Sequence, residues 1–168
     1  MGPNRIAHTA LYLALAIALP MAFHWTGLGG RLFLPMHIPV LICGFVVGPL
    51  AGLLVGLIAP FMSHLLTSMP PAYAVPLMTM ELAIYGLVAG LTFKKLKMNI
   101  IPALLIAMIV GRLAFALGLF LLGQFIELPY GPAEFLVGGI LLASWPGIII
   151  QFILIPPLVY AIRQSSRQ

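Results

Sequence analysis

The sequence predicts an all-α membrane protein: a compact bundle of six transmembrane helices, formed by one domain (residues 1–168), with both termini in the cytoplasm. Of its 168 residues, 62% are hydrophobic and only 7% are charged, whereas a soluble domain carries about 25% charged residues. The apolar runs are long and do not alternate with polar residues, which argues against a barrel. Helices then satisfy the backbone hydrogen bonds in lipid.

Six apolar segments are the candidate spans. A spanning helix needs about 20 residues, so the second segment is short, and Pro49 separates it from the third just after Gly48. The segments cover approximately residues 7–23, 33–47, 49–67, 76–93, 100–122 and 136–162.

The basic residues predict the orientation, because cytoplasmic connections are enriched in Lys and Arg. They stand at segment ends and form no basic stripe, so the net charge of +5 does not indicate nucleic-acid binding. With six spans, one side receives Arg5, Lys94, Lys95, Lys97, Arg163 and Arg167, and the other side receives Arg31, Glu127 and Glu134. The richer side should be the cytoplasm.

Small residues recur at helical spacing in several segments. Helices in lipid associate by close packing, which small side chains permit. Glycines occupy every fourth position from Gly44 to Gly56, and we interpret them as packing residues inside the bundle. The stripe of Ala10, Ala14 and Ala18 in the first segment has two interpretations of equal weight: packing inside the bundle, or a face offered to a separate subunit.

Two ionisable residues lie at membrane depth. Glu81 is about 7–8 Å below the start of the fourth segment, and Arg112 is about 15 Å from the outer end of the fifth. On a helical wheel Glu81 shares a face with Tyr85, nearly opposite Gly86. Such groups face the protein interior or a wet cavity. Either they pair with each other and hold two helices together, or they meet a polar solute, and the two interpretations are compatible.

His37 stands between Pro35 and Pro39, where proline interrupts regular helix. We expect backbone groups around residues 36–38 to be free at the rim of a solute pocket, with His37 beside them. Tyr73, in a proline-rich outer connection, is a further candidate for the pocket.

Trp145, in the outer half of the sixth segment, either stacks on a solute ring or packs internally. Gln151 is expected to form an interhelical hydrogen bond. His24, His37 and His64 lie near outer ends of segments and could in principle bind a metal, but no acid or cysteine has ligand spacing with them, so hydrogen bonding to backbone is favoured.

Catalytic motifs are missing from the chain. It has no aspartate, no HExxH, no GxSxG and no Walker loop, so we expect neither an enzyme nor a bound cofactor.

The sequence resembles the substrate-binding S components of energy-coupling factor (ECF) transporters, which import vitamins into bacteria. The resemblance covers nearly the whole chain. It depends on the six spans, the alanine stripe, and the motifs "PMHIPVLICGFVVGPLAGLLVGLIAP", "LLTSMPPAY" and "MELAIYGLVAGL".

The resemblance implies a subunit of the bacterial cytoplasmic membrane that binds a small water-soluble vitamin near its outer surface. The loop between the first two spans would gate the site. Ala10, Ala14 and Ala18 would contact the membrane coupling subunit, and two cytoplasmic ATPases would use ATP to drive the cycle. The depth-based candidates for the pocket are His37, Tyr73, Glu81, Tyr85, Arg112 and Trp145.

The substrate stays open at this point. One acid, one base and several aromatic residues suit a partly anionic vitamin such as pantothenate, and riboflavin-, biotin- or pyridoxine-like compounds are further candidates. The alternative functions are an assembly subunit without a ligand and a transition-metal uptake subunit, while an intramembrane enzyme is disfavoured by the missing catalytic groups.

Overall fold

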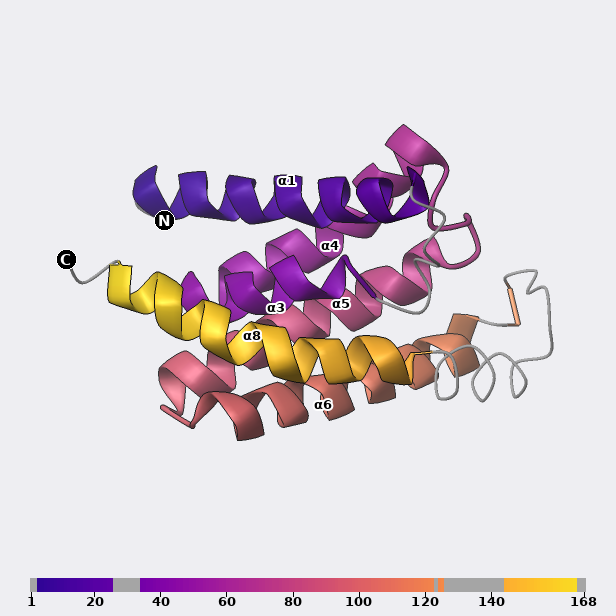
Figure 1. Ribbon diagram of the computed structural model, residues 1–168. Helices are drawn as coiled ribbons and strands as arrows, with labels where there is room; N and C mark the ends of the chain where they lie inside the picture. Colours follow the sequence, from indigo (N-terminus) through magenta and orange to yellow (C-terminus); the bar gives the residue numbers. More distant parts are fainter. Residues whose placement is uncertain (1–2, 26–33, 123, 126–143, 166–168) are drawn as a thin grey trace.

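The computed structural model describes residues 3–25, 34–122, 124–125 and 144–165, and every regular element in these ranges is a helix (Figure 1). The predicted all-α class is therefore confirmed. The helices are α1 (Pro3–Trp25), α3 (His37–Val46), α4 (Pro49–Thr67), α5 (Val75–Gly90), the π-helical turn η1 (Leu91–Lys95), α6 (Ile100–Leu122) and α8 (Trp145–Ser165).

Five helical segments are long and apolar enough to span a membrane: Asn4–Phe23, Pro49–Thr67, Val75–Lys95, Ile100–Leu122 and Trp145–Ser165. The described ends of the chain lie at the same end of the bundle (Figure 1). This placement agrees with the predicted even number of crossings.

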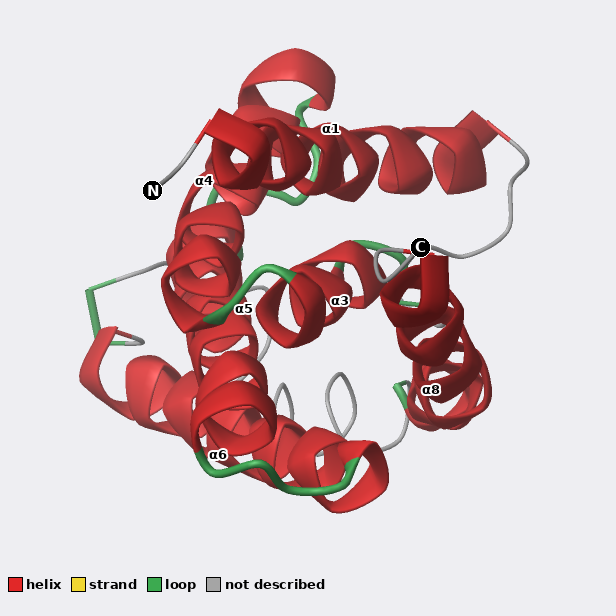
Figure 2. Ribbon diagram, turned by 90° about the vertical axis from the view of Figure 1, so that its left-hand side faces the viewer, coloured by secondary structure: helices red, strands yellow, loops and turns green. Residues whose placement is uncertain are grey.

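Helix α3 corrects the predicted segment 33–47. It has 10 residues and is therefore about 15 Å long, half of the roughly 30 Å hydrocarbon thickness. Leu34 before it has a positive φ of 48°, and Gly48 after it has a φ of 135°, so the backbone leaves the helical conformation on both sides. Eight of the 10 residues are buried, and Figure 2 shows α3 in the middle of the bundle, with α1, α5 and α8 around it.

Helix α5 packs backbone to backbone against α3 and α4 through the predicted glycines. A Cβ atom added at Gly52 of α4 would lie 2.5 Å from the carbonyl oxygen of Gly86. A Cβ at Gly44 of α3 would likewise collide with the Gly86 backbone. Gly44, Gly52 and Gly56 thus act as packing residues, as predicted, and bring α3, α4 and α5 closer than side chains would allow. The prediction is wrong for Gly48, where an added Cβ would meet only Cδ of Lys94 at 3.8 Å and the φ of 135° serves the turn between α3 and α4.

The turn between α3 and α4 is fixed by Lys94 of η1. The Lys94 ammonium donates hydrogen bonds to the carbonyl oxygens of Val46 and Val47. These carbonyls belong to the C-terminal end of α3, where the helix dipole favours a cation. Lys94 therefore joins the end of α5 to the end of α3.

One side of α1 faces the bundle and the other faces outward. Tyr12 and Ala16 are 6% and 0% exposed against the core, whereas Ala10, Ala14 and Ala18 are exposed. Of the two interpretations of the alanine stripe, internal packing is therefore wrong. The stripe forms a smooth outer face of α1.

Candidate functional site

The packing of α5 positions Glu81 at the centre of the bundle. Because Gly86 lies against α4, the opposite face of α5, which bears Glu81, turns away from α4. Glu81 is 2% exposed although it is ionisable, and burial of a charge is costly unless partners compensate it.

Arg112 of α6 is the ionic partner of Glu81. Its Nη1 atom lies 2.9 Å from Oε1 of Glu81, and the two side chains are 19% and 3% exposed. The predicted ion pair between the fourth and fifth segments is therefore confirmed.

His37, the first residue of α3, approaches Glu81 from the other side. Its Nε2 atom lies 3.7 Å from Oε2 of Glu81, which is too long for a hydrogen bond. The prediction of free backbone groups is wrong for His37 itself, because its N–H donates to the carbonyl of Leu34 at 3.1 Å. His37 is 2% exposed, so its imidazole side chain lies in the protein interior.

Tyr85 completes the cluster one helical turn after Glu81. Its phenol interacts with the Glu81 carboxylate, and its ring meets that of His37 edge-on, with centroids 5.3 Å apart. The ring lies over Gly111 of α6, where an added Cβ would be 3.0 Å from Cγ of Tyr85 and closer still to two other ring carbons. Gly111 therefore makes the room that Tyr85 occupies. We refer to His37, Glu81, Tyr85 and Arg112 as the polar cluster.

Buried polar atoms without a hydrogen-bond partner are concentrated in this cluster and in one residue of α8. A side-chain hydrogen-bonding atom left unpaired in a protein interior costs about 1–3 kcal/mol, so each such atom needs an explanation. Within the described ranges, the atoms are Nδ1 and Nε2 of His37, Oε1 of Glu81, Nη2 of Arg112, and Nε2 and Oε1 of Gln151. Oε1 of Glu81 is within ion-pair distance of Arg112, but the contact lacks the direction of a hydrogen bond.

Gln151 is the functional candidate that sequence reasoning missed. It is 0% exposed, and neither of its amide atoms has a partner, so the predicted interhelical hydrogen bond is wrong. It lies six residues after Trp145, or about 9 Å along α8. A glutamine in the outer half of a span was the available signal, but that residue type alone does not separate a helix contact from a solute contact.

The remaining predicted pocket residues lie at the outer end of the bundle. Tyr73 is half-buried in the turn that leads into α5. Trp145, at the start of α8, is 59% exposed, so it is not part of the buried cluster. The loop predicted to gate the site and most of the outer connection at residues 123–135 lie outside the described residues. The predicted solute pocket near the outer surface therefore stays a prediction.

The histidines do not come together within the described residues. Nδ1 of His64 lies 2.8 Å from the carbonyl oxygen of Pro70, and Nδ1 of His8 lies 2.6 Å from that of Asn4, so both have the predicted backbone partner. Across the described part of the chain, no three His, Cys, Asp or Glu side chains are grouped as metal ligands. The side chain of His24 lies outside that part.

Comparison with known families gives one match. The family model described as "ECF transporter, substrate-specific component" matches residues 4–159, nearly the whole chain. Neither the curated proteins nor the solved structures contain a match to it.

Proposed function

Since the chain belongs to the family of ECF transporter substrate-specific components, we propose that it captures a small water-soluble vitamin or related micronutrient at its polar cluster. Membership implies a small-molecule substrate and association with coupling and ATPase subunits of an ECF transporter. The proposal adds where the substrate binds, which side chains meet it, and which helix face meets the coupling subunit.

The observation that carries the proposal is the set of buried side-chain atoms on His37, Glu81, Arg112 and Gln151 that have no hydrogen-bond partner within the described residues. A protein optimised for stability alone would pair these atoms or replace them with apolar groups. A bound polar molecule would supply the missing hydrogen bonds, and its polar groups would in turn be satisfied away from water. Binding sites commonly combine such convergent polar groups with apolar walls.

The charges of the cluster limit the substrate. Glu81 already compensates Arg112, so the described residues hold no unpaired arginine charge here for a strongly anionic ligand. The unpaired donors and acceptors instead favour a molecule that carries both kinds of hydrogen-bonding group and little net charge. Pantothenate, which has one carboxylate, and pyridoxine-, biotin- or riboflavin-like compounds all carry both kinds of group, so all of them are candidates.

The binding test uses Gln151→Leu, because Leu has a similar size and no polar atoms. If Gln151 serves a ligand, the variant should be as stable as the parent or more stable by about 1 kcal/mol, yet bind its vitamin more weakly. Native mass spectrometry and thermal shifts against a panel of water-soluble vitamins measure both effects. Gln164→Leu, at an exposed position of the same helix, is the matched control.

Two outcomes would contradict the proposed binding site. One is a Gln151→Leu protein that binds its vitamin as tightly as the parent. The other is a parent protein that neither carries nor binds any compound of the panel, which would favour an assembly subunit without a ligand.

The smooth face of α1 supports the proposed contact with the coupling subunit. Ala14 is exposed in its centre, and a close helix contact in lipid requires small side chains. Ala14→Leu should therefore abolish co-purification with the coupling subunit and the ATPases while vitamin binding persists. Ala161→Leu, which adds the same bulk at an exposed position of α8, should leave co-purification unchanged; retention of the complex by Ala14→Leu would refute the assignment.

A further inference from the structure

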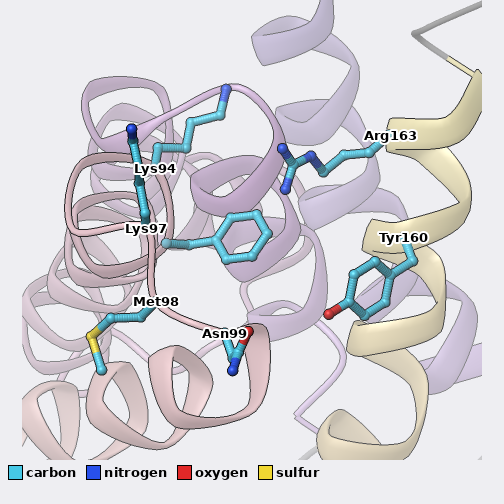
Figure 3. Close-up of a pocket in the computed structure, with 7 residues that line it drawn as sticks. Lys94, Lys97, Met98, Asn99, Tyr160 and Arg163 are labelled. Carbon is cyan, nitrogen blue, oxygen red and sulfur yellow. The ribbon is translucent and has the colours of Figure 1, made fainter.

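A second polar feature lies away from the cluster, at the end of the bundle where α5 leads into α6. A cavity of about 560 Å³ opens there between the end of α5, the turn into α6 and the last turns of α8. Figure 3 shows side chains from both sides of this opening. Its lining residues are Phe93, Lys94, Lys97, Met98, Asn99, Tyr160 and Arg163.

The cavity carries positive charge without a compensating acid. Three lining side chains, Lys94, Lys97 and Arg163, are cationic and none is acidic. Among the described residues Glu81 is the single acid, and it is paired with Arg112. Arg5 and Arg163 are close enough to Lys94 to interact with it electrostatically. An anion in the cavity would relieve this repulsion.

The backbone at the start of α6 adds to the positive potential in the cavity. Helix α6 begins directly after Asn99, whose carbonyl accepts a hydrogen bond from the N–H of Ala103 at 3.1 Å. The N-terminus of this long helix therefore borders the cavity, and a helix N-terminus carries a partial positive charge that favours anions. The Arg163 guanidinium is held 4.9 Å from the centre of the Phe93 ring, which positions one cation at the wall.

The surroundings indicate a lipid rather than a soluble anion. Leu96 and Ile101, which flank the lining residues 97–99 in the sequence, are 68% and 59% exposed, so acyl chains have an apolar surface beside the cavity. The charge distribution places this end at the cytoplasmic leaflet. Basic pockets between helices at that level suit phospholipid head groups.

We propose that the cavity binds the phosphate of an anionic phospholipid of the cytoplasmic leaflet, with Lys97 and Arg163 as its principal contacts. Lys94 also lines the cavity and adds positive charge there, while its ammonium donates hydrogen bonds to the end of α3. The proposal goes beyond the proposed function and is independent of the vitamin, because the cavity is well separated from the polar cluster: Lys94 follows Glu81 by 13 residues, or about 20 Å along the helix.

The test compares lipid retention by the full chain in nanodiscs made from equal parts phosphatidylglycerol and phosphatidylcholine. After transfer to detergent, native mass spectrometry should show the parent with one phosphatidylglycerol retained. Each basic side chain near an anionic surface contributes about a fivefold gain in affinity, so Lys97→Gln/Arg163→Gln should bind this lipid about 30-fold more weakly. Lys97→Arg/Arg163→Lys should restore binding, and Lys95→Gln, outside the cavity, should retain it.

Three results would overturn the proposal. The first is equal phosphatidylglycerol affinity for the double Gln variant and for Lys95→Gln. The second is thermal stabilisation of the parent by inorganic phosphate as large as that by phosphatidylglycerol, which would indicate a soluble anion. The third is a double Gln variant that keeps its lipid but loses the coupling subunit, which would indicate a protein contact. A melting temperature unchanged from that of the parent checks that the double Gln variant is folded.

Discussion

Breaking the Glu81–Arg112 pair should destabilise the fold far more when one partner is removed than when both are. At 2.9 Å and an effective dielectric constant of about 20, the attraction between two unit charges is about 6 kcal/mol. Desolvation offsets part of this energy, and loss of one partner of a buried pair typically costs about 3–5 kcal/mol.

The different burial of the two groups predicts which single variant loses more unfolding free energy. In Arg112→Gln the Glu81 side chain, 3% exposed, is left as an uncompensated buried carboxylate, and we expect a loss of about 4 kcal/mol. In Glu81→Gln the stranded Arg112 is 19% exposed and has a long side chain that can reach water, so we expect about 3 kcal/mol. The double variant holds two neutral amides and should lose at least 2 kcal/mol less than the sum.

Equilibrium unfolding in mixed detergent micelles, followed by far-ultraviolet circular dichroism, measures these differences. Lys95→Gln, which removes an exposed cation, should change the unfolding free energy by less than about 0.5 kcal/mol. If the losses of the two single variants simply add in the double variant, the two side chains are not coupled and the ion pair does not hold α5 to α6.

The glycine contacts and the lysine that fixes α3 lead to three more predictions. Gly52→Ala should lower the unfolding free energy by about 1–3 kcal/mol, since its Cβ would lie 2.5 Å from the Gly86 carbonyl oxygen. Gly118→Ala should lower it less, because its Cβ would meet the flexible Met80 side chain. Equal thermal stabilities of the two variants would contradict this prediction. Gly111→Ala should displace the Tyr85 ring and weaken vitamin binding in a thermal-shift titration, and unaltered affinity would separate Tyr85 from the site. Lys94→Met should lose about 2 kcal/mol of unfolding free energy, because two carbonyl partners lose a charged donor; a loss no larger than that of Lys95→Gln would show that these hydrogen bonds contribute little.

Composition and spacing were sufficient for the helical class, and they led to the pairing of Glu81 with Arg112 as one of two compatible interpretations. A carboxylate and a guanidinium at membrane depth have few alternatives to each other, and glycines at four-residue spacing indicate where helices approach closely. The length of α3 was not predictable in the same way. Its apolar run extends over the irregular residues before His37, and hydropathy does not detect a change of backbone conformation such as the positive φ of Leu34.

Which individual residues belong to the candidate site was harder to predict from the sequence. Trp145 is amphipathic, so its type agrees equally with a pocket wall and with the exposed helix start where it lies. Gln151 was assigned a partner because unpaired amides are rare in protein interiors. Gln151 is an exception to that general rule, and the proposed ligand would account for it.

The contact of α5 with α3 and α4 restricts the relative motion of these three helices. Where carbonyl and glycine Cα atoms already touch, two helices cannot slide or tilt past each other without collision, since no pliable side chains lie between them. These three helices therefore behave as a rigid frame that carries His37, Glu81 and Tyr85. If the proposed site is correct, a motion that admits the solute would have to come from α6 and α8, which bear Arg112 and Gln151.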